Sequence, residues 1–205
     1  MIKTVTFDLG GVIITIDQGQ AQKRFEEIGV KDAKVLLDPY TQTGFFGDLE
    51  EGLITPQEFA DKLSEIAGKK MSFEDCKYAW TGYCKEVPLR NLHLLEKLRE
   101  EGYRLLLLSN TNPFMQDWAN SPEFSPEGKP LSSYFDAVYL SYQMKAMKPS
   151  EQIFRKMLLK EQTLPEEILF VDDSPRNVAA ASEMGIKTFC PKNGEDWTKE
   201  IYNFL

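Results

Sequence analysis

The sequence predicts an α/β protein: a doubly wound, mostly parallel, Rossmann-like sheet with a small all-helical domain inserted after the first strand. Three observations predict it: short apolar runs, amphipathic segments between them, and one region whose pattern is helical throughout. Near-continuous apolar runs suit strands that are covered on both faces, as in a parallel sheet. The expected strands are residues 2–7, 104–108, 135–140, 168–171 and 186–190.

Helical patterns lie between these runs in the second half of the chain and before residue 104. One covers residues 88–101, with leucines at every third position on one side. A second begins near Pro149. A third follows Ser174-Pro175, a typical N-cap and first-turn pair, and ends at Gly185. Strands that alternate with helices in this way imply a parallel sheet.

The region of residues 18–86 breaks this alternation. Amphipathic helical stretches fill it, at 21–28, 56–67 and 73–83, and it contains no clear strand. We therefore predict a core α/β domain of residues 1–17 and 87–205, and a helical cap domain of residues 18–86.

Composition and charge exclude several classes of partner. The 205 residues are 42% hydrophobic and 12% aromatic, as in a globular protein with a substantial core. With 24 basic and 32 acidic residues, the net charge of −8 argues against nucleic acids and anionic membranes. Three cysteines without CxxC spacing argue against disulfides and structural zinc. No leader-type cleavage site or bilayer-length apolar stretch is present, so we expect a cytoplasmic location.

Ligands of open α/β sheets bind at the carboxyl ends of the strands. The side chains expected there supply carboxylates, a hydroxyl, an amide and an amine: Asp8, Ser109, Asn110, Lys148, Asp172 and Asp173. Each alone has an ordinary explanation, such as a turn, a helix cap or a surface lysine. Together, three carboxylates repel one another unless a cation lies among them, and oxygen-only ligation favours Mg²⁺ over zinc.

The four segments that carry these residues, after the first four expected strands, resemble the four motifs of the haloacid dehalogenase superfamily in order and spacing, over nearly the whole chain. The insertion resembles the small cap of the subfamily that includes phosphoglycolate phosphatase and β-phosphoglucomutase. Residues 8–12 and 108–112 look like a branch similar to bacterial glucose-1-phosphate phosphatase. Most members of the superfamily are Mg²⁺-dependent phosphatases. The resemblance therefore implies a hydrolase acting on a small phosphorylated metabolite, with sugar phosphates among the candidates.

The resemblance also implies a division of roles around the metal. Asp8 would attack phosphorus and form an aspartyl phosphate. Its second oxygen, the backbone carbonyl of Gly10 and the side chain of Asp173 would hold Mg²⁺, with Asp172 acting through a water.

The remaining residues are implied to bind the phosphoryl group. The hydroxyl of Ser109 and the backbone N–H of Asn110 would bind its oxygens. Lys148 would neutralise charge on the nucleophile and on the phosphoryl group.

One position departs from the family pattern. The first motif usually carries a second Asp, which protonates the leaving group, and here that position is Gly10. A missing acid can cost on the order of 10²–10⁴ in rate. Either the leaving group needs little protonation, or Asp17 or a cap residue supplies the proton, or the chemistry is different.

Two other functions are therefore alternatives. A 2-haloacid dehalogenase would use Asp8 without a metal, but those enzymes lack the paired acids seen here at Asp172-Asp173. A non-catalytic binding or regulatory domain of the same fold would explain Gly10, but not the retained cluster of acids.

Overall fold

The structure, a computed structural model, describes residues 1–31, 33–37 and 44–205. Its centre is a five-stranded parallel sheet in the order β5-β4-β1-β6-β7. The strands are β1 (Thr4–Phe7), β4 (Arg104–Ser109), β5 (Ala137–Leu140), β6 (Ile168–Val171) and β7 (Lys187–Phe189). Every predicted apolar run overlaps one of them, and the predicted fold class is confirmed.

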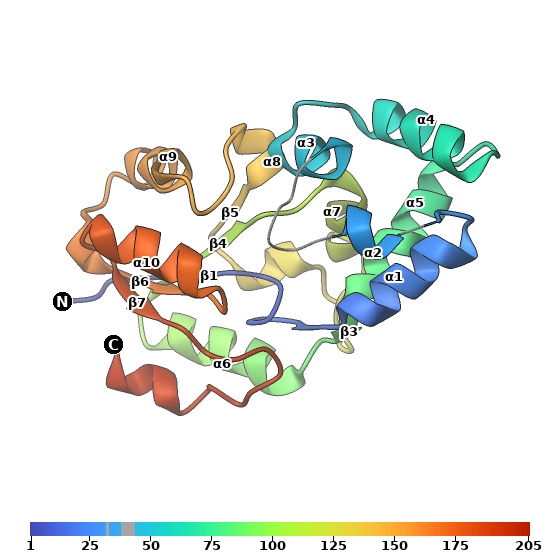
Figure 1. Ribbon diagram of the computed structural model, residues 1–205. Helices are drawn as coiled ribbons and strands as arrows, with labels where there is room; N and C mark the ends of the chain where they lie inside the picture. Colours follow the sequence, from blue (N-terminus) through green and yellow to red (C-terminus); the bar gives the residue numbers. More distant parts are fainter. Residues whose placement is uncertain (32, 38–43) are drawn as a thin grey trace.

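Helices cover both faces of this sheet. Figure 1 shows α6 (Leu89–Glu100) with the C-terminal segment on one face, and α9 (Glu151–Glu161) with α10 (Pro175–Glu183) on the other. Alternate strand residues point to opposite faces. Val5 and Phe7 accordingly join the buried cluster of α6, while Leu106 and Phe170 join that of α9 and α10. Burial on both faces explains why the strands read as unbroken apolar runs.

Two short helices leave the strand ends. They are α7 (Pro113–Ala119), which follows β4, and α8 (Ser141–Met144), which follows β5. Asn112 caps α7, its side-chain oxygen accepting the backbone N–H groups of Phe114 and Met115. Four segments of 3-10 helix complete the described elements: η1 (Thr81–Tyr83), η2 (Leu131–Tyr134), η3 (Pro165–Glu167) and η4 (Glu200–Asn203).

An ion pair fastens α9 to the sheet. The Nε of Arg104 lies 2.5 Å from an oxygen of Glu161, whose side chain is only 6% exposed and also accepts the hydroxyl of Tyr139. Burial would raise the pKa of Glu161, but the hydrogen bonds from Arg104 and Tyr139 outweigh it and hold that pKa below its usual value.

The region between β1 and α6 is mostly helical, as predicted. It contains α1 (Gln18–Glu27), α2 (Ala33–Leu36), α3 (Phe45–Glu51), α4 (Pro56–Ala67) and α5 (Phe73–Trp80), which lie together at the end to which the strands point (Figure 1). Capping boxes begin α4 at Thr55 and α5 at Ser72. Two helices of the region, α2 and α3, were not predicted.

The absence of a strand from this region was a wrong prediction. The chain enters the insertion through β2 (Thr15–Ile16) and leaves it through β3 (Cys84–Glu86), and these two strands pair antiparallel. Strands this short carry no alternation that a sequence pattern could show. The pair is held in part by Asn193, whose side-chain amide bonds both the N–H and the C=O of Ile16.

The apolar core of the insertion continues into the sheet domain. Its cluster includes Phe25, Phe59 and Trp80 from the insertion, together with Phe114 and Met115 from α7. None of the described helices has the length and apolar character needed to cross a membrane.

Candidate active site

The carboxyl ends of two neighbouring strands, β1 and β6, bring the expected acids together. Asp8 directly follows β1, and its N–H donates to the carbonyl of Val171 at 2.9 Å, which continues the pairing of β1 with β6. Asp172 and Asp173 directly follow β6. Each of the three acids offers one oxygen, and these oxygens lie within 4.8 Å of one another. The parallel register therefore produces the predicted cluster.

Lys148 joins this cluster from the loop after α8. Its Nζ lies 2.9 Å from Asp8 Oδ1 and 2.7 Å from Asp172 Oδ2, and its side chain is 1% exposed. Burial alone would lower the pKa of Lys148, but the charges of Asp172 and Asp8 raise it above its ordinary value. Lys148 is therefore a buried cation shared by two carboxylates.

The side chain of Asn110 holds Lys148 in place. Its Nδ2 donates to the carbonyl of Lys148 and its Oδ1 accepts the N–H of Lys148, both at 2.8 Å. The sequence had suggested only the backbone N–H of Asn110 as functional, so this clamp is an additional role. Ser109, the last residue of β4, is 2% exposed and lines the same cleft as Asp8 and Lys148.

Asp172 is fully buried and engaged by protein donors. Besides Lys148, its carboxylate accepts the N–H of Ser174 at 2.9 Å and the side-chain amide of Asn177 at 3.1 Å to each oxygen. These bonds orient Asp172 so that it fixes Lys148. Such an arrangement suits a carboxylate that positions the ammonium group of Lys148 rather than one that reacts.

Asp8 is also fixed in orientation. Its Oδ1 accepts the N–H of Leu9 at 2.7 Å in addition to the ion pair with Lys148. Burial raises the pKa of Asp8 to about 7; Lys148 opposes this shift, and the neighbouring Asp172 and Asp173 add to it. Burial, followed by the charge of Asp172, likewise raises the pKa of Asp173 to about 6.

The donor set fits a divalent cation. Three carboxylates lie together with a single lysine, so negative charge is in excess. Burial is the main cause of the raised pKa values of Asp8 and Asp173, and the charges of the neighbouring carboxylates add to it. The ligands are all oxygens, which suits Mg²⁺. The loop after β1 touches Asp173 closely: a Cβ added to Gly11, whose φ is +76°, would lie 2.0 Å from Asp173 Oδ2. Only glycine fits there without moving the acid.

A cleft of about 910 Å³ lies over these groups. Its floor consists of the residues at the strand ends. Its wall comes from the insertion and includes Phe46, Glu50, Trp80 and Tyr83. The sequence did not single out Glu50 or Tyr83 as site residues. No motif marks them, because their place in the cleft depends on how the insertion packs on the sheet domain.

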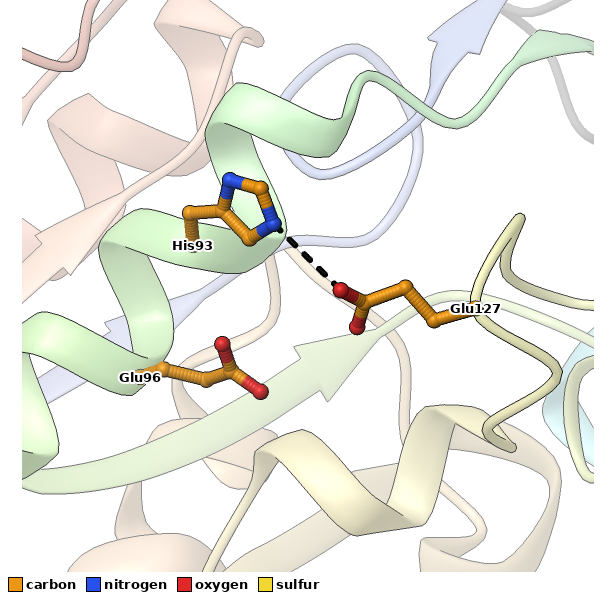
Figure 2. Close-up of side chains that lie close together, drawn as sticks. All are labelled: His93, Glu96 and Glu127. Atoms are coloured by element: carbon orange, nitrogen blue, oxygen red, sulfur yellow. Dashed lines mark hydrogen bonds and ion pairs between the residues drawn. The ribbon is translucent and has the colours of Figure 1, made fainter.

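A second group of potential metal ligands lies elsewhere. Figure 2 shows His93 and Glu96 of α6 close to Glu127, with His93 Nε2 3.4 Å from a Glu127 oxygen. The Nζ of Lys129 lies 2.9 Å from Glu96 and 3.0 Å from Glu127, so this surface cluster already holds a cation of its own. It lies outside the cleft.

Comparison with known protein families identifies the family of this chain. The family of haloacid dehalogenase-like hydrolases matches residues 2–185, which include all the site residues described above. The chain belongs to the haloacid dehalogenase-like hydrolases. The family predicted from the four motifs is confirmed.

Several relatives resemble the chain over nearly its full length. The D-ribitol-5-phosphate phosphatase of Bacteroides thetaiotaomicron is 47% identical over 201 residues, 98% of this chain and 97% of the relative. A HAD-like family hydrolase from Porphyromonas gingivalis has a TM-score of 0.94 at 43% identity, covering 99% of this chain and 97% of its own. A HAD family enzyme of Bacteroides thetaiotaomicron, solved with magnesium and inorganic phosphate, has a TM-score of 0.88 at 38% identity, covering 98% and 99%.

More distant structures share the fold alone. An L-2-haloacid dehalogenase has a TM-score of 0.60 at 20% identity and covers 95% of this chain and 91% of its own. The finer resemblance to the glucose-1-phosphate phosphatase branch stays a prediction.

Proposed function

We propose that this protein is a Mg²⁺-dependent phosphatase that hydrolyses a small phosphate monoester through an aspartyl phosphate on Asp8. One observation carries the proposal: Asp8 lies 2.9 Å from a buried lysine and beside the acid pair Asp172-Asp173. This combination suits phosphoryl transfer, which needs mainly positioning and charge stabilisation. Relatives of 47% and 38% identity, one named a phosphatase and one solved with magnesium and phosphate, support it.

The nucleophile is prepared by two donors. Leu9 N–H and Lys148 Nζ both bind Asp8 Oδ1, which fixes the rotation of the carboxylate. Lys148 offsets negative charge on Asp8 and on the incoming phosphoryl group. Its ammonium group is fixed for this role, because Asn110 binds the backbone of Lys148 and Asp172 binds its Nζ. Such preorganised charge costs no rearrangement when the reaction occurs.

We assign the remaining groups around this nucleophile. Ser109 Oγ and the N–H of Asn110 bind phosphoryl oxygens at the end of β4. Asp8, Asp173 and the carbonyl of Gly10 hold Mg²⁺, with Asp172 behind them. The metal offsets the charge of the phosphate, so that an anionic carboxylate can approach it.

We infer that the substrate is a sugar phosphate or sugar-alcohol phosphate. The cleft, about 910 Å³, is of the size that holds a small molecule. Its wall mixes aromatic rings, such as Trp80, with hydrogen-bonding groups, such as Tyr83 and Glu50, as a polyhydroxylated leaving group requires. The name of the relative from Bacteroides thetaiotaomicron, D-ribitol-5-phosphate phosphatase, supports this substrate class.

We also propose that residues 18–86 act as a cap domain that selects the leaving group. Helices α3 and α5 of this region contribute to the cleft wall. The three cysteines are free, which fits the cytoplasmic location predicted from the sequence.

The decisive test is phosphate release from p-nitrophenyl phosphate. We expect activity with Mg²⁺, its loss with EDTA, and its restoration by added Mg²⁺. Asp8→Asn keeps the size of the side chain and should be inactive, while the control Asp117→Asn, on the exposed side of α7, should keep wild-type activity. Metal-independent chloride release from 2-chloropropionate without phosphatase activity would establish the dehalogenase alternative. Full biological activity of Asp8→Asn would establish the binding-domain alternative.

A further inference from the structure

The proposed reaction needs a proton donor for the leaving group, and the first motif does not supply one. The position two residues after Asp8 is Gly10, which has no side chain. Asp17, a candidate from the sequence, is used elsewhere: its carboxylate caps α1 by accepting the N–H of Gln20 at 3.0 Å. Asp17 is also not among the residues that line the cleft.

Glu50 occupies a suitable place. It lies on α3 and lines the cleft together with Asp8. Burial raises the pKa of Glu50 to about 7, and the charge of Asp8 adds to the shift. A carboxyl group with a pKa near the working pH can donate a proton in one step and accept one in the next.

The backbone at Glu50 is tied to the phosphate-binding side of the cleft. The carbonyl of Glu50 accepts the hydroxyl of Ser141 at 2.6 Å. That same hydroxyl accepts the N–H of Thr111 at 3.0 Å, and Thr111 lies two residues after Ser109. Ser141 is fully buried. One hydroxyl therefore sets the distance between Glu50 and the loop that follows β4.

The end of α3 is docked just as closely on α8. A Cβ added to Gly52, whose φ is +73°, would lie 2.1 Å from the carbonyl oxygen of Tyr142, so only glycine permits this approach. Lys145 also donates to the carbonyl of Gly52. Although Glu50 belongs to the insertion, its helix is fastened to the sheet domain.

We propose that Glu50 is the general acid and base of the reaction, in place of the acid that Gly10 lacks. This inference rests on the proposed function. In the first step, an oxygen of Asp8 bonds to phosphorus, the bond to the leaving oxygen breaks, and the proton of Glu50 passes to that oxygen. In the second, Glu50 takes a proton from water, the water oxygen bonds to phosphorus, and the bond to Asp8 breaks. Inorganic phosphate leaves and Glu50 is protonated again.

Another acid of α3 provides a matched control. Asp48 lies on the same helix as Glu50, but it is not among the residues that line the cleft. Tyr83 is a poor substitute for Glu50. Burial raises the pKa of its phenol above the ordinary value, so the phenol stays protonated and cannot act as the base.

The test compares two substrates that differ in their need for a proton. Alkyl oxygen leaves D-ribitol 5-phosphate only when protonated, whereas the phenolate of 2,4-dinitrophenyl phosphate leaves without a proton. For Glu50→Gln we expect kcat on the ribitol ester to fall by on the order of 10²–10⁴. The dinitrophenyl ester should give a rapid burst of one product per enzyme and then slow turnover, because water is no longer activated. Mass spectrometry should find the phosphoryl group retained on Asp8.

The controls separate the possible failures. Asp48→Asn should keep wild-type kinetics on both esters. Glu50→Ala, a second variant that leaves space beside the cleft, should regain activity with added formate. If neither Glu50 variant loses activity on the ribitol ester, or if the burst on the dinitrophenyl ester slows as much as hydrolysis of the ribitol ester, Glu50 is not the acid, and the proposed function stands. If the wild type hydrolyses neither ester, or Asp8→Asn hydrolyses both, the proposed function fails and this assignment with it.

Discussion

Phe114 joins the insertion to the sheet domain, and its removal gives a quantitative test of how the two are coupled. The residue lies on α7 but belongs to the apolar cluster of the insertion. It is fully buried, with ring-centroid distances of 5.6 Å to Phe59 and 4.7 Å to Phe73. Phe114→Ala would therefore open a cavity at the junction.

The expected cost follows from this burial. Truncating a buried phenylalanine to alanine costs about 3–5 kcal/mol, because the transferred apolar surface is lost and the cavity collapses only in part. For a chain of this size, 1 kcal/mol corresponds to a shift in melting temperature of about 2–4 °C. We expect a loss of roughly 6–20 °C on this scale.

Urea unfolding followed by circular dichroism measures the free energy of unfolding, and hydrogen exchange locates the change. For Phe114→Ala, peptides from α4 and α5 should exchange faster relative to those from β6. The matched control is Phe154→Ala. Phe154 is a fully buried residue of α9, and its ring centroid lies 5.3 Å from that of Phe170, on the sheet face that α9 and α10 cover. Its loss of stability should be similar, but exchange should rise in α9 and β6.

Two results would contradict this reasoning. A loss of stability below about 1 kcal/mol would mean that the site collapses without a cavity. An equal rise of exchange in the insertion and in the sheet would mean that Phe114 stabilises the whole chain rather than the junction.

Three further predictions concern the site and its support. Lys148→Met leaves two buried carboxylates without their cation, and we expect kcat on p-nitrophenyl phosphate to fall by on the order of 10²–10³; unchanged kcat would refute its role. Gly11→Ala would crowd Asp173, so the Mg²⁺ concentration for half-maximal activity should rise by roughly 10–100-fold. Gly68→Ala, with φ +67° and no atom within 4 Å of the added Cβ, should keep the wild-type Mg²⁺ dependence. Glu161→Gln should lower the free energy of unfolding at pH 7 by about 1–3 kcal/mol. Because the folded-state pKa of Glu161 is depressed, this difference should persist above about pH 4.5 and vanish as the pH falls through that pKa, which urea melts across pH can follow.

The sequence predicted the sheet and the floor of the site well, for a physical reason. Strands buried on both faces need apolar side chains throughout, so their ends are visible as the points where polar residues begin. Asp8 and Asp172 each stand directly after such a run. Once the strands are taken as parallel neighbours, these ends must meet. Lys148 was predicted from its place after the third expected strand, although a short helix, α8, lies between that strand and Lys148. Only the resemblance to a family indicated its role.

The cleft wall could not be predicted in this way. Glu50 lies in a seven-residue helix whose position depends on one hydroxyl, that of Ser141, and on the close approach of Gly52 to α8. Phe114 looks like an ordinary core residue of α7, and no local pattern shows that its partners are in the insertion. Contacts between segments distant in the chain leave no periodic trace in either segment.

Placing the proton donor on the insertion would have a consequence for specificity. An acid on the loop after β1, as at the position of Gly10, acts on any phosphate ester that reaches the nucleophile. Glu50 instead belongs to the wall that contacts the leaving group, beside Tyr83 and Trp80. An ester whose leaving group does not fill this wall would admit water between Glu50 and the leaving oxygen, and proton transfer would slow. Recognition of the leaving group and its protonation would then depend on the same helix, so substitutions in the wall should lower kcat as well as raise KM.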